Sequence, residues 1–262
     1  MVEEIINWIK EYFINSGVKG VVIGNSGGKD SATVIALLTK ALGKEKVLPV
    51  VIPCHSKEDD MKDAEKLAKT FGLENLILDI TNVYDSLENS ATDSNINLND
   101  EAKINIKPRL RMTLLYAIAQ TKGYLVAGTG NMCEQYVGYT TKWGDNASDF
   151  NPIANLTVDE VIEVGMALGV PEEIINKPPH DGLGGLTDEE KMGITYNEIA
   201  EVIKTGTTKN KESLRKIQEM HRKTEHKRNS IPSYKSTTLD LSIQLTDIWI
   251  VYTFWLLWSM LL

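Results

Sequence analysis

The sequence VVIGNSGGKDSATVIALL, residues 21–38, places two adjacent glycines between an apolar, β-branched run and a helical pattern. Gly27 and Gly28 let the backbone turn tightly, so that several backbone N–H groups point into one hollow. The positive end of the helix that follows strengthens the attraction of this hollow for anions. The stretch therefore predicts a phosphate-binding turn between a strand and a helix.

Short apolar runs and amphipathic stretches alternate on both sides of this turn. Strands are expected at Gly20–Gly24, Val47–Pro53, Leu76–Ile80 and Tyr124–Gly128, and helices at Glu3–Asn15, Ser31–Leu42, Lys57–Phe71 and Pro108–Lys122. Buried strands that alternate with helices predict an α/β fold, with one doubly wound parallel sheet flanked by helices in a single domain. Ligands of such folds bind at the carboxyl ends of the strands, where the turn lies.

Two polar stretches interrupt the alternation. SLENSATDSNINLND, Ser86–Asp100, is aperiodic and is expected to form a mobile loop. KPPHDGLGGLTDEE, Lys177–Glu190, interrupts a mostly helical part of the chain that begins at Thr157. Its glycines and prolines are typical of a lid or binding loop.

The composition is that of an ordinary soluble protein with one large core, because 42% of the residues are hydrophobic and 24% are charged. A formal net charge of -8 argues against broad binding to nucleic acid, which needs a basic face. Cys54 and Cys133 lie far apart in the sequence and predict neither a disulfide framework nor a zinc site. With an acidic start, MVEEIINWIKEYF, that is unlike a signal peptide, the expected location is the cytoplasm.

The segment Gly24–Ser31 differs from the two commonest phosphate-binding motifs. Asp30 follows Gly28 and Lys29 at the position where a Walker A loop requires Ser or Thr, and G-x-G-x-x-G is absent from the segment. The segment does match SGGxDS, and so resembles the pyrophosphate loop of the ATP pyrophosphatases, which cleave ATP between the α- and β-phosphates. An ordinary strand-to-helix turn is the alternative explanation.

Further segments narrow this resemblance. In chain order they are NIKPRLRMTLLYAIA, YLVAGTGNMCEQYVGYTTKWGDNASDFNPIANL, KPPHDGL and EHKRNSIP. Together they resemble the single-domain, ammonia-dependent NAD synthetases from about residue 3 to about residue 234, and the block Gly128–Asp149 is the most specific part. The resemblance implies that ATP adenylates deamido-NAD with release of pyrophosphate, and that ammonia then displaces AMP. It also implies Mg²⁺ and a homodimer that shares its deamido-NAD sites between subunits.

The resemblance assigns roles to the residues that match the family's motifs. The ATP-binding candidates are Gly24, Asn25, Ser26, Gly27, Gly28, Lys29, Asp30, Ser31, Thr129, Val158 and His180. Lys29 and Asp30 are also the catalytic candidates, and Asp30 and Glu134 are expected to hold Mg²⁺, which prefers hard oxygen ligands. The deamido-NAD candidates are Arg109, Lys142, Asp149, His226 and Lys227, whereas Arg111 is expected to be structural.

Several candidates also have an ordinary explanation. Asp30 would favour the dipole of the helix that it begins, and Glu134 would be a solvated loop carboxylate. Thr129, between two glycines, would be part of a turn. Arg109 and the lysines would be solvated surface charges.

Two residues depart from the family's pattern. Val158 stands where the family usually has a lysine that reaches the ATP phosphates, and His180 stands where Ser or Thr commonly contacts ATP. Lys29 stands where an uncharged residue is frequent, so it either restores the missing cation or points to solvent. Two other functions therefore stay open: another ATP pyrophosphatase-type enzyme, or a nucleotide-binding relative without catalysis. A tRNA-modifying enzyme should carry a basic appendage or paired cysteines, which this chain lacks.

The C-terminal end does not resemble the family. The chain is expected to divide into an NAD synthetase-type domain, residues 1–235, and an atypical apolar tail, residues 236–262. The uncharged run Ile248–Leu262 is shorter than the roughly 20 apolar residues of a membrane-spanning helix. A packed or oligomerising helix, a membrane-surface segment and an altered reading frame are the three explanations, of which the last is preferred. No membrane partner is expected unless the tail provides one.

Overall fold

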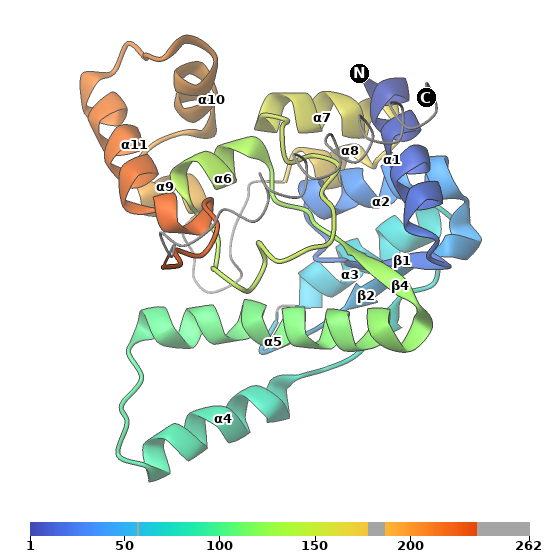
Figure 1. The fold of residues 1–262 in the computed structure, drawn as a ribbon, viewed down its shortest axis with the longest axis horizontal. Coiled ribbons are helices and arrows are strands. Elements are labelled where there is room, and N and C mark those ends of the chain that lie inside the picture. Colours follow the sequence, from blue (N-terminus) through green and yellow to red (C-terminus); the bar gives the residue numbers. More distant parts are fainter. Residues whose placement is uncertain (57, 178–186, 235–262) are drawn as a thin grey trace, which may run out of the picture. The chain divides into compact units, whose positions relative to one another are not determined.

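The computed structural model describes residues 1–56, 58–177 and 187–234 (Figure 1). The chain divides into two compact units, residues 1–228 and residues 229–262, and the described part of the second unit contains no helix or strand. The elements of the first unit are α1 (Val2–Ser16), β1 (Gly20–Gly24), α2 (Lys29–Leu42), η1 (Lys44–Lys46), β2 (Val47–Val51), α3 (Glu58–Thr70), β3 (Leu76–Ile77), α4 (Thr81–Asp93), α5 (Asp100–Lys122), β4 (Tyr124–Ala127), α6 (Met132–Val137), α7 (Val158–Ala167), α8 (Glu172–Ile175), α9 (Asp188–Met192), α10 (Tyr196–Thr205), α11 (Lys211–Lys223) and η2 (Glu225–Lys227).

The strands form one parallel sheet in the order β3-β2-β1-β4. Val22 of β1 pairs with Leu48 of β2 on one side and with Val126 of β4 on the other. The direction of winding reverses at β1, because β2 and β3 lie on one side of it and β4 lies on the other. The carboxyl ends of β1 and β4 therefore flank a switch point, which is where open α/β sheets bind their ligands.

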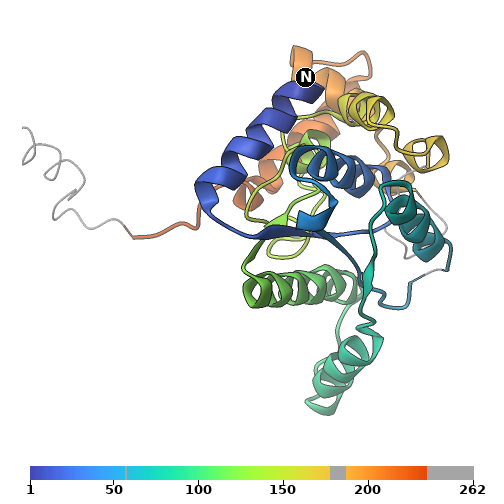
Figure 2. The ribbon, with the colours of Figure 1, turned by 90° about the vertical axis from the view of Figure 1, so that its right-hand side faces the viewer.

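Successive residues of β1 enter different apolar cores. Val21 and Ile23 pack in a core that includes residues of α1, α2, α3 and α7, whereas Val22 packs with residues of α4 and α5. Helices therefore cover both faces of the sheet, and both views place α5 on the face opposite α1 and α2 (Figures 1 and 2). The predicted doubly wound, parallel α/β fold is confirmed.

A further apolar cluster fixes the position of α6. Cys133 and Val137 of α6 are buried against Ile199 of α10 and Ile217 of α11. The C-terminal helices thus form a support for α6, whose N-terminus follows the end of β4 in the chain.

The predicted loop Ser86–Asp100 is wrong over its first half, which belongs to α4. The polar side chains are compatible with a helix because the hydroxyls of Ser86 and Ser90 each donate to the carbonyl four residues earlier. Glu88 also forms an ion pair with Lys103 of α5. The polar composition therefore reflects an exposed helix that pairs with a neighbour.

Helix α5 begins earlier than the predicted start at Pro108. The side-chain oxygen of Asn99 accepts a hydrogen bond from the N–H of Ala102 at 2.8 Å and caps the helix at Asp100. Pro108 therefore lies inside the helix, although proline is typical of a first helical turn.

Some expectations fall on residues that the structure does not describe. The tail, residues 236–262, and His180 lie outside the described residues, as does most of the predicted lid. Within the described residues, no helix has the length and apolar character needed to cross a membrane.

Candidate active site

The side chain of Asn25 fastens the turn after β1 to the protein interior. It is 3% exposed, its Nδ2 donates to the carbonyl of Ala64 at 2.9 Å, and its Oδ1 accepts from the N–H of Gly27 at 3.2 Å. Gly27 has a φ of 75°, and a Cβ at this position would lie 2.6 Å from the carbonyl oxygen of Asp60. Only glycine therefore fits at this corner of the turn.

The hydroxyls of Ser26 and Ser31 hold the other side of the turn. Their Oγ atoms lie 3.0 Å apart, and the Ser31 hydroxyl also donates to the carbonyl of Gly28. α2 begins directly after Gly28, and the N–H of Ala32 makes a helical bond to the Gly28 carbonyl at 3.0 Å. The N–H groups that precede Ala32 lie at the positive end of α2, so the turn has the geometry of an anion-binding site.

A second turn follows β4 and is joined to the first by Asn131. The Asn131 Oδ1 accepts from the N–H of Glu134 at 3.1 Å, and the Asn131 N–H donates to Glu134 Oε2 at 2.9 Å, so that the two residues cap α6. The Asn131 Nδ2 donates to Oδ1 of Asp30 at 3.0 Å. Asn131 is not among the predicted site residues, although Asn followed by Glu three residues later, after a strand, is a capping signal.

The negative charge of Asp30, one predicted metal ligand, acts on Glu134, the other. Burial and the neighbouring Asp30 carboxylate raise the pKa of the Glu134 carboxyl well above its ordinary range. A cation between the two carboxylates would offset the unfavourable energy of keeping both of them charged and buried side by side. Mg²⁺ is commonly held by one or two carboxylates together with phosphate oxygens and water, so the pair fits this ion. Among the described residues, no group of three or more His, Cys, Asp or Glu could hold a metal by itself.

Lys29 points into the protein. It is 5% exposed, and its Nζ lies 3.1 Å from Oδ2 of Asp30. Burial alone would lower the pKa of Lys29, but the charges of Asp30 and Glu134 outweigh it and raise this pKa above its ordinary value. The alternative of a solvent-facing Lys29 is therefore excluded.

Tyr196 borders the same site, although it is not among the predicted residues. The Lys29 Nζ lies 5.7 Å from the centroid of the Tyr196 ring. The side chain is 3% exposed, and its hydroxyl has no hydrogen-bond partner among the residues that the structure describes. Val158 is 8% exposed and packs in the same apolar cluster as Tyr196.

Four of the predicted deamido-NAD residues meet around the loop that follows α6. The Arg109 Nε donates to the carbonyl of Lys142 at 3.3 Å, and the Lys142 Nζ donates to the carbonyl of His226 at 2.7 Å. The Lys227 Nζ donates to the carbonyls of residues 138 and 140 at 2.7 and 2.5 Å. These three cationic side chains therefore also hold the loop after α6 against α5 and η2.

Asp149, the remaining candidate, lies at the edge of the sheet. Its Oδ2 accepts from the N–H of Val126 in β4 at 2.7 Å, and its Oδ1 accepts from the Tyr116 hydroxyl at 3.4 Å. Thr129 follows β4 and is half-buried. Arg111 donates to the carbonyl of Ile52 at 3.0 Å, a contact that suits its expected structural role.

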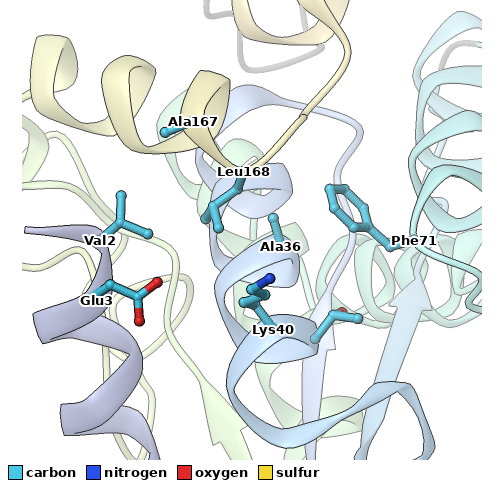
Figure 3. Close-up of a pocket in the computed structure, with 8 residues that line it drawn as sticks. Val2, Glu3, Ala36, Lys40, Phe71, Ala167 and Leu168 are labelled. Carbon is cyan, nitrogen blue, oxygen red and sulfur yellow. The ribbon is translucent and has the colours of Figure 1, made fainter.

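A polar hollow of about 370 Å³ lies beside the second turn, with Gly130, Asp145, Asn151, Lys227 and Arg228 among its lining residues. Several of its lining residues belong to the sequence block Gly128–Asp149. A second hollow of about 360 Å³ is lined by Glu3 of α1, Lys40 of α2 and Phe71 (Figure 3), and it contains none of the predicted site residues.

Most of the chain, including both turns, matches a known protein family. The family model for NAD synthase matches residues 1–231. This chain belongs to the NAD synthase family. The predicted resemblance to ammonia-dependent NAD synthetases is thereby confirmed, and the alternative of another kind of ATP pyrophosphatase is set aside.

Similar proteins of this family include both curated sequences and solved structures. The NH(3)-dependent NAD(+) synthetase of Carboxydothermus hydrogenoformans is 42% identical over 228 residues, which cover 86% of this chain and 93% of the relative. The structure of NMN synthetase from Francisella tularensis is 34% identical with a TM-score of 0.84, and the match covers 90% of this chain and 97% of that one. An NH3-dependent NAD synthetase from Campylobacter jejuni is 29% identical with a TM-score of 0.75, and the match covers 89% and 97% of the two chains.

Proposed function

We propose that this NAD synthase family member joins ammonia to the nicotinate carboxyl group of deamido-NAD, with ATP as co-substrate and Mg²⁺ as cofactor. The observation that carries this proposal is the hydrogen bond of 3.0 Å between Asn131 and Asp30. It joins the turn after β1 to the turn before Glu134 after β4, which supports one site for the proposed phosphate-binding and metal-binding groups.

In the first step, a nicotinate carboxylate oxygen attacks the α-phosphorus of ATP, and the bond from this phosphorus to the bridging oxygen of the β-phosphate breaks. The N–H groups at the start of α2 would hold the departing pyrophosphate. Asp30 and Glu134 would hold Mg²⁺, which when bound neutralises negative charge on the phosphates. Catalysis here depends on holding two anions together, so positioning and charge matter more than proton transfer.

In the second step, the nitrogen of ammonia attacks the carbonyl carbon of the adenylate, the bond to the AMP oxygen breaks, and the nitrogen loses a proton.

The polar hollow beside α6 would receive the deamido-NAD, whose pyrophosphate is negatively charged. Lys227 and Arg228 line this hollow, and Arg109 and Lys142 are joined to the loop beside it. Cations at these positions suit a doubly charged dinucleotide.

A second substrate, nicotinate mononucleotide, is favoured by one observation. The Francisella tularensis structure, with a TM-score of 0.84 and 34% identity, is named an NMN synthetase. Nicotinate mononucleotide carries the same reacting carboxyl group as deamido-NAD but lacks the AMP half. A comparison of the two substrates therefore tests whether the site needs the AMP half of the dinucleotide.

The active form is proposed to be a cytoplasmic homodimer. Four large apolar side chains are exposed along α4, α5 and the loop between them: Val83 by 53%, Leu87 by 40%, Ile96 by 56% and Ile104 by 41%. α4 lies beyond α5, away from the sheet (Figures 1 and 2). Exposed apolar side chains gathered on two neighbouring helices are typical of a protein interface, and a second copy of the chain would cover them.

The direct test incubates the purified full-length chain with ATP, Mg²⁺, an ammonium salt and either deamido-NAD or nicotinate mononucleotide. Chromatography should detect equal amounts of AMP and the amidated nucleotide, and none when the ammonium salt is omitted or Mg²⁺ is chelated. Glutamine in place of ammonium serves as the control nitrogen donor. Binding of ATP without release of AMP would instead indicate a nucleotide-binding relative that has lost catalysis.

A further inference from the structure

The Lys29 ammonium lies where a cation is needed by the two carboxylates. Its Nζ is 3.1 Å from Oδ2 of Asp30, and the relative exposures of the two side chains are 5% and 19%. The charge of Glu134 also stabilises this ammonium. A divalent cation on Asp30 and Glu134 would share a small, partly desolvated volume with Lys29, and the two positive charges would repel each other strongly.

We propose that Lys29 is a built-in counter-ion, which binds Asp30 in the metal-free protein and passes to the phosphates of the nucleotide when the divalent cation binds. The inference rests on the proposed function, because it takes Asp30 and Glu134 as the metal ligands.

Both oxygens of Asp30 are already engaged. Oδ1 accepts a hydrogen bond from Asn131 at 3.0 Å, and Oδ2 is paired with Lys29 at 3.1 Å. Asn131 is fully buried and is fixed by its capping bonds to Glu134. The Asp30 carboxylate therefore cannot rotate freely to present another oxygen, and a metal that approaches it competes with the ammonium of Lys29.

A displaced ammonium needs another anion, because its surroundings are buried. One side of it is bordered by the Tyr196 ring, at 5.7 Å from Nζ to the centroid, and Tyr196 packs in an apolar cluster with Val158. A buried charge that loses its partner is strongly unfavourable. Lys29 directly follows the glycines of the turn, so the phosphates of a nucleotide bound at this turn would lie within the reach of its flexible side chain.

This arrangement couples the two ligands. A metal that binds alone takes Asp30 and Glu134 from the ammonium and leaves it only the weaker influence of the Asp188 charge. A metal that arrives with a nucleotide supplies phosphates in their place. The nucleotide therefore strengthens metal binding, and by linkage the metal strengthens nucleotide binding by the same factor. Removing the charge of Lys29 should make metal binding tighter without a nucleotide, and should weaken the coupling.

The test measures binding of Mn²⁺, as a probe for Mg²⁺, to the nucleotide-free full-length protein by electron paramagnetic resonance of the free ion. Lys29→Met and Lys29→Gln should each bind Mn²⁺ at least about ten-fold more tightly than the unchanged protein, a difference of about 1.4 kcal/mol. Lys40→Gln is the matched control, because it removes an exposed lysine from the same helix, and it should leave Mn²⁺ binding unchanged. Thermal melting of each variant checks that the fold is kept.

A second measurement follows the coupling itself. Calorimetry gives the affinity for a non-hydrolysable ATP analogue with and without Mn²⁺, and the enhancement by Mn²⁺ should be smaller in both Lys29 variants than in the unchanged protein. Equal or weaker Mn²⁺ binding by folded Lys29 variants would overturn the inference.

The failure of the proposed metal site has a different signature. Asp30→Asn and Glu134→Gln, each placed in the Lys29→Met background, should remove the gain in Mn²⁺ binding. A gain that survives both substitutions would place the metal elsewhere and overturn the inference together with the metal assignment. An unchanged protein that makes the amide while the Lys29 variants gain no Mn²⁺ affinity would overturn the counter-ion alone.

Discussion

The start of α2 and the α4–α5 pair depart from the usual distribution of polar and apolar side chains in opposite directions. At the first, charged and polar groups are buried, with Asn131 at 0% and Lys29 at 5% exposure. At the second, Ile96 and Val83 are 56% and 53% exposed. Buried charges are stabilised by charged ligands, and exposed apolar side chains are stabilised by contact with a protein. We therefore expect the two regions to bind different kinds of molecule.

Removing the charge of either Asp30 or Glu134 should have the largest effect of all on activity. Asp30→Asn and Glu134→Gln should each lower the rate of pyrophosphate release by about 1,000-fold, because several kcal/mol of charge stabilisation are lost while the side chain keeps its size. The control is Glu163→Gln on the exposed side of α7, which should change this rate less than two-fold, a difference typical of a surface substitution. Near-normal release from either site variant would refute the metal assignment.

Changing the shape of the turn without its charge should have the next largest effect. Gly27→Ala places a methyl group 2.6 Å from the Asp60 carbonyl and strains a φ of 75°, so we expect the kcat/KM for ATP to fall by about 100-fold. Gly206→Ala has a similar φ of 78° but meets no atom within 4 Å. It should lower the melting temperature slightly and leave kcat/KM unchanged, which separates the steric effect on the turn from backbone strain.

A substitution in the α4–α5 pair should weaken dimerisation without unfolding the protein. Leu87→Glu places a charge in the exposed apolar surface of α4 and should weaken dimerisation by about ten-fold or more, as measured by sedimentation equilibrium. Ile14→Glu on α1 is the control, since Ile14 is 75% exposed and lies outside this surface. An unchanged chain that sediments as a fully active monomer would contradict the proposed interface.

The smallest effect is expected from removing the segment that belongs to neither region. A chain truncated after Lys235 should keep its activity to within a few-fold, because every candidate residue precedes that position. Steady-state kinetics and sedimentation of the truncated chain provide the measurement. Loss of the active dimer would mean that residues 236–262 take part in the structure.

Local sequence was enough to predict the core of the fold and the position of the turn. The β-branched run of β1, the glycines and the helical pattern of α2 are adjacent in the chain, so each supports the others. The same reasoning was wrong for Ser86–Asp100, because polar side chains looked like a loop while their hydroxyls satisfy helical carbonyls in α4. Composition alone does not distinguish an exposed helix from an irregular segment.

The candidate site was predictable as a set of residues but not as a set of contacts. Strand topology brings Asp30 and Glu134 to neighbouring strand ends, which the alternation of strands and helices already implied. The Lys29 Nζ lies 5.7 Å from the centroid of the Tyr196 ring, which belongs to a distant helix. The bond from Asn131 to Asp30 joins residues 101 apart in sequence. Contacts of this kind depend on tertiary packing and have no local signal.

That separation has a consequence for the order in which the molecule is made. A growing chain releases β1, the turn and α2 long before β4 and Asn131 exist, so the anion-binding half of the site can form first. Long-range pairing of parallel strands is also slow, because the intervening chain must be closed into a loop. We therefore expect pulsed hydrogen exchange during refolding to protect β1 and β2 before the Asn131 amide, which would make the metal-holding half the last part of the site to mature.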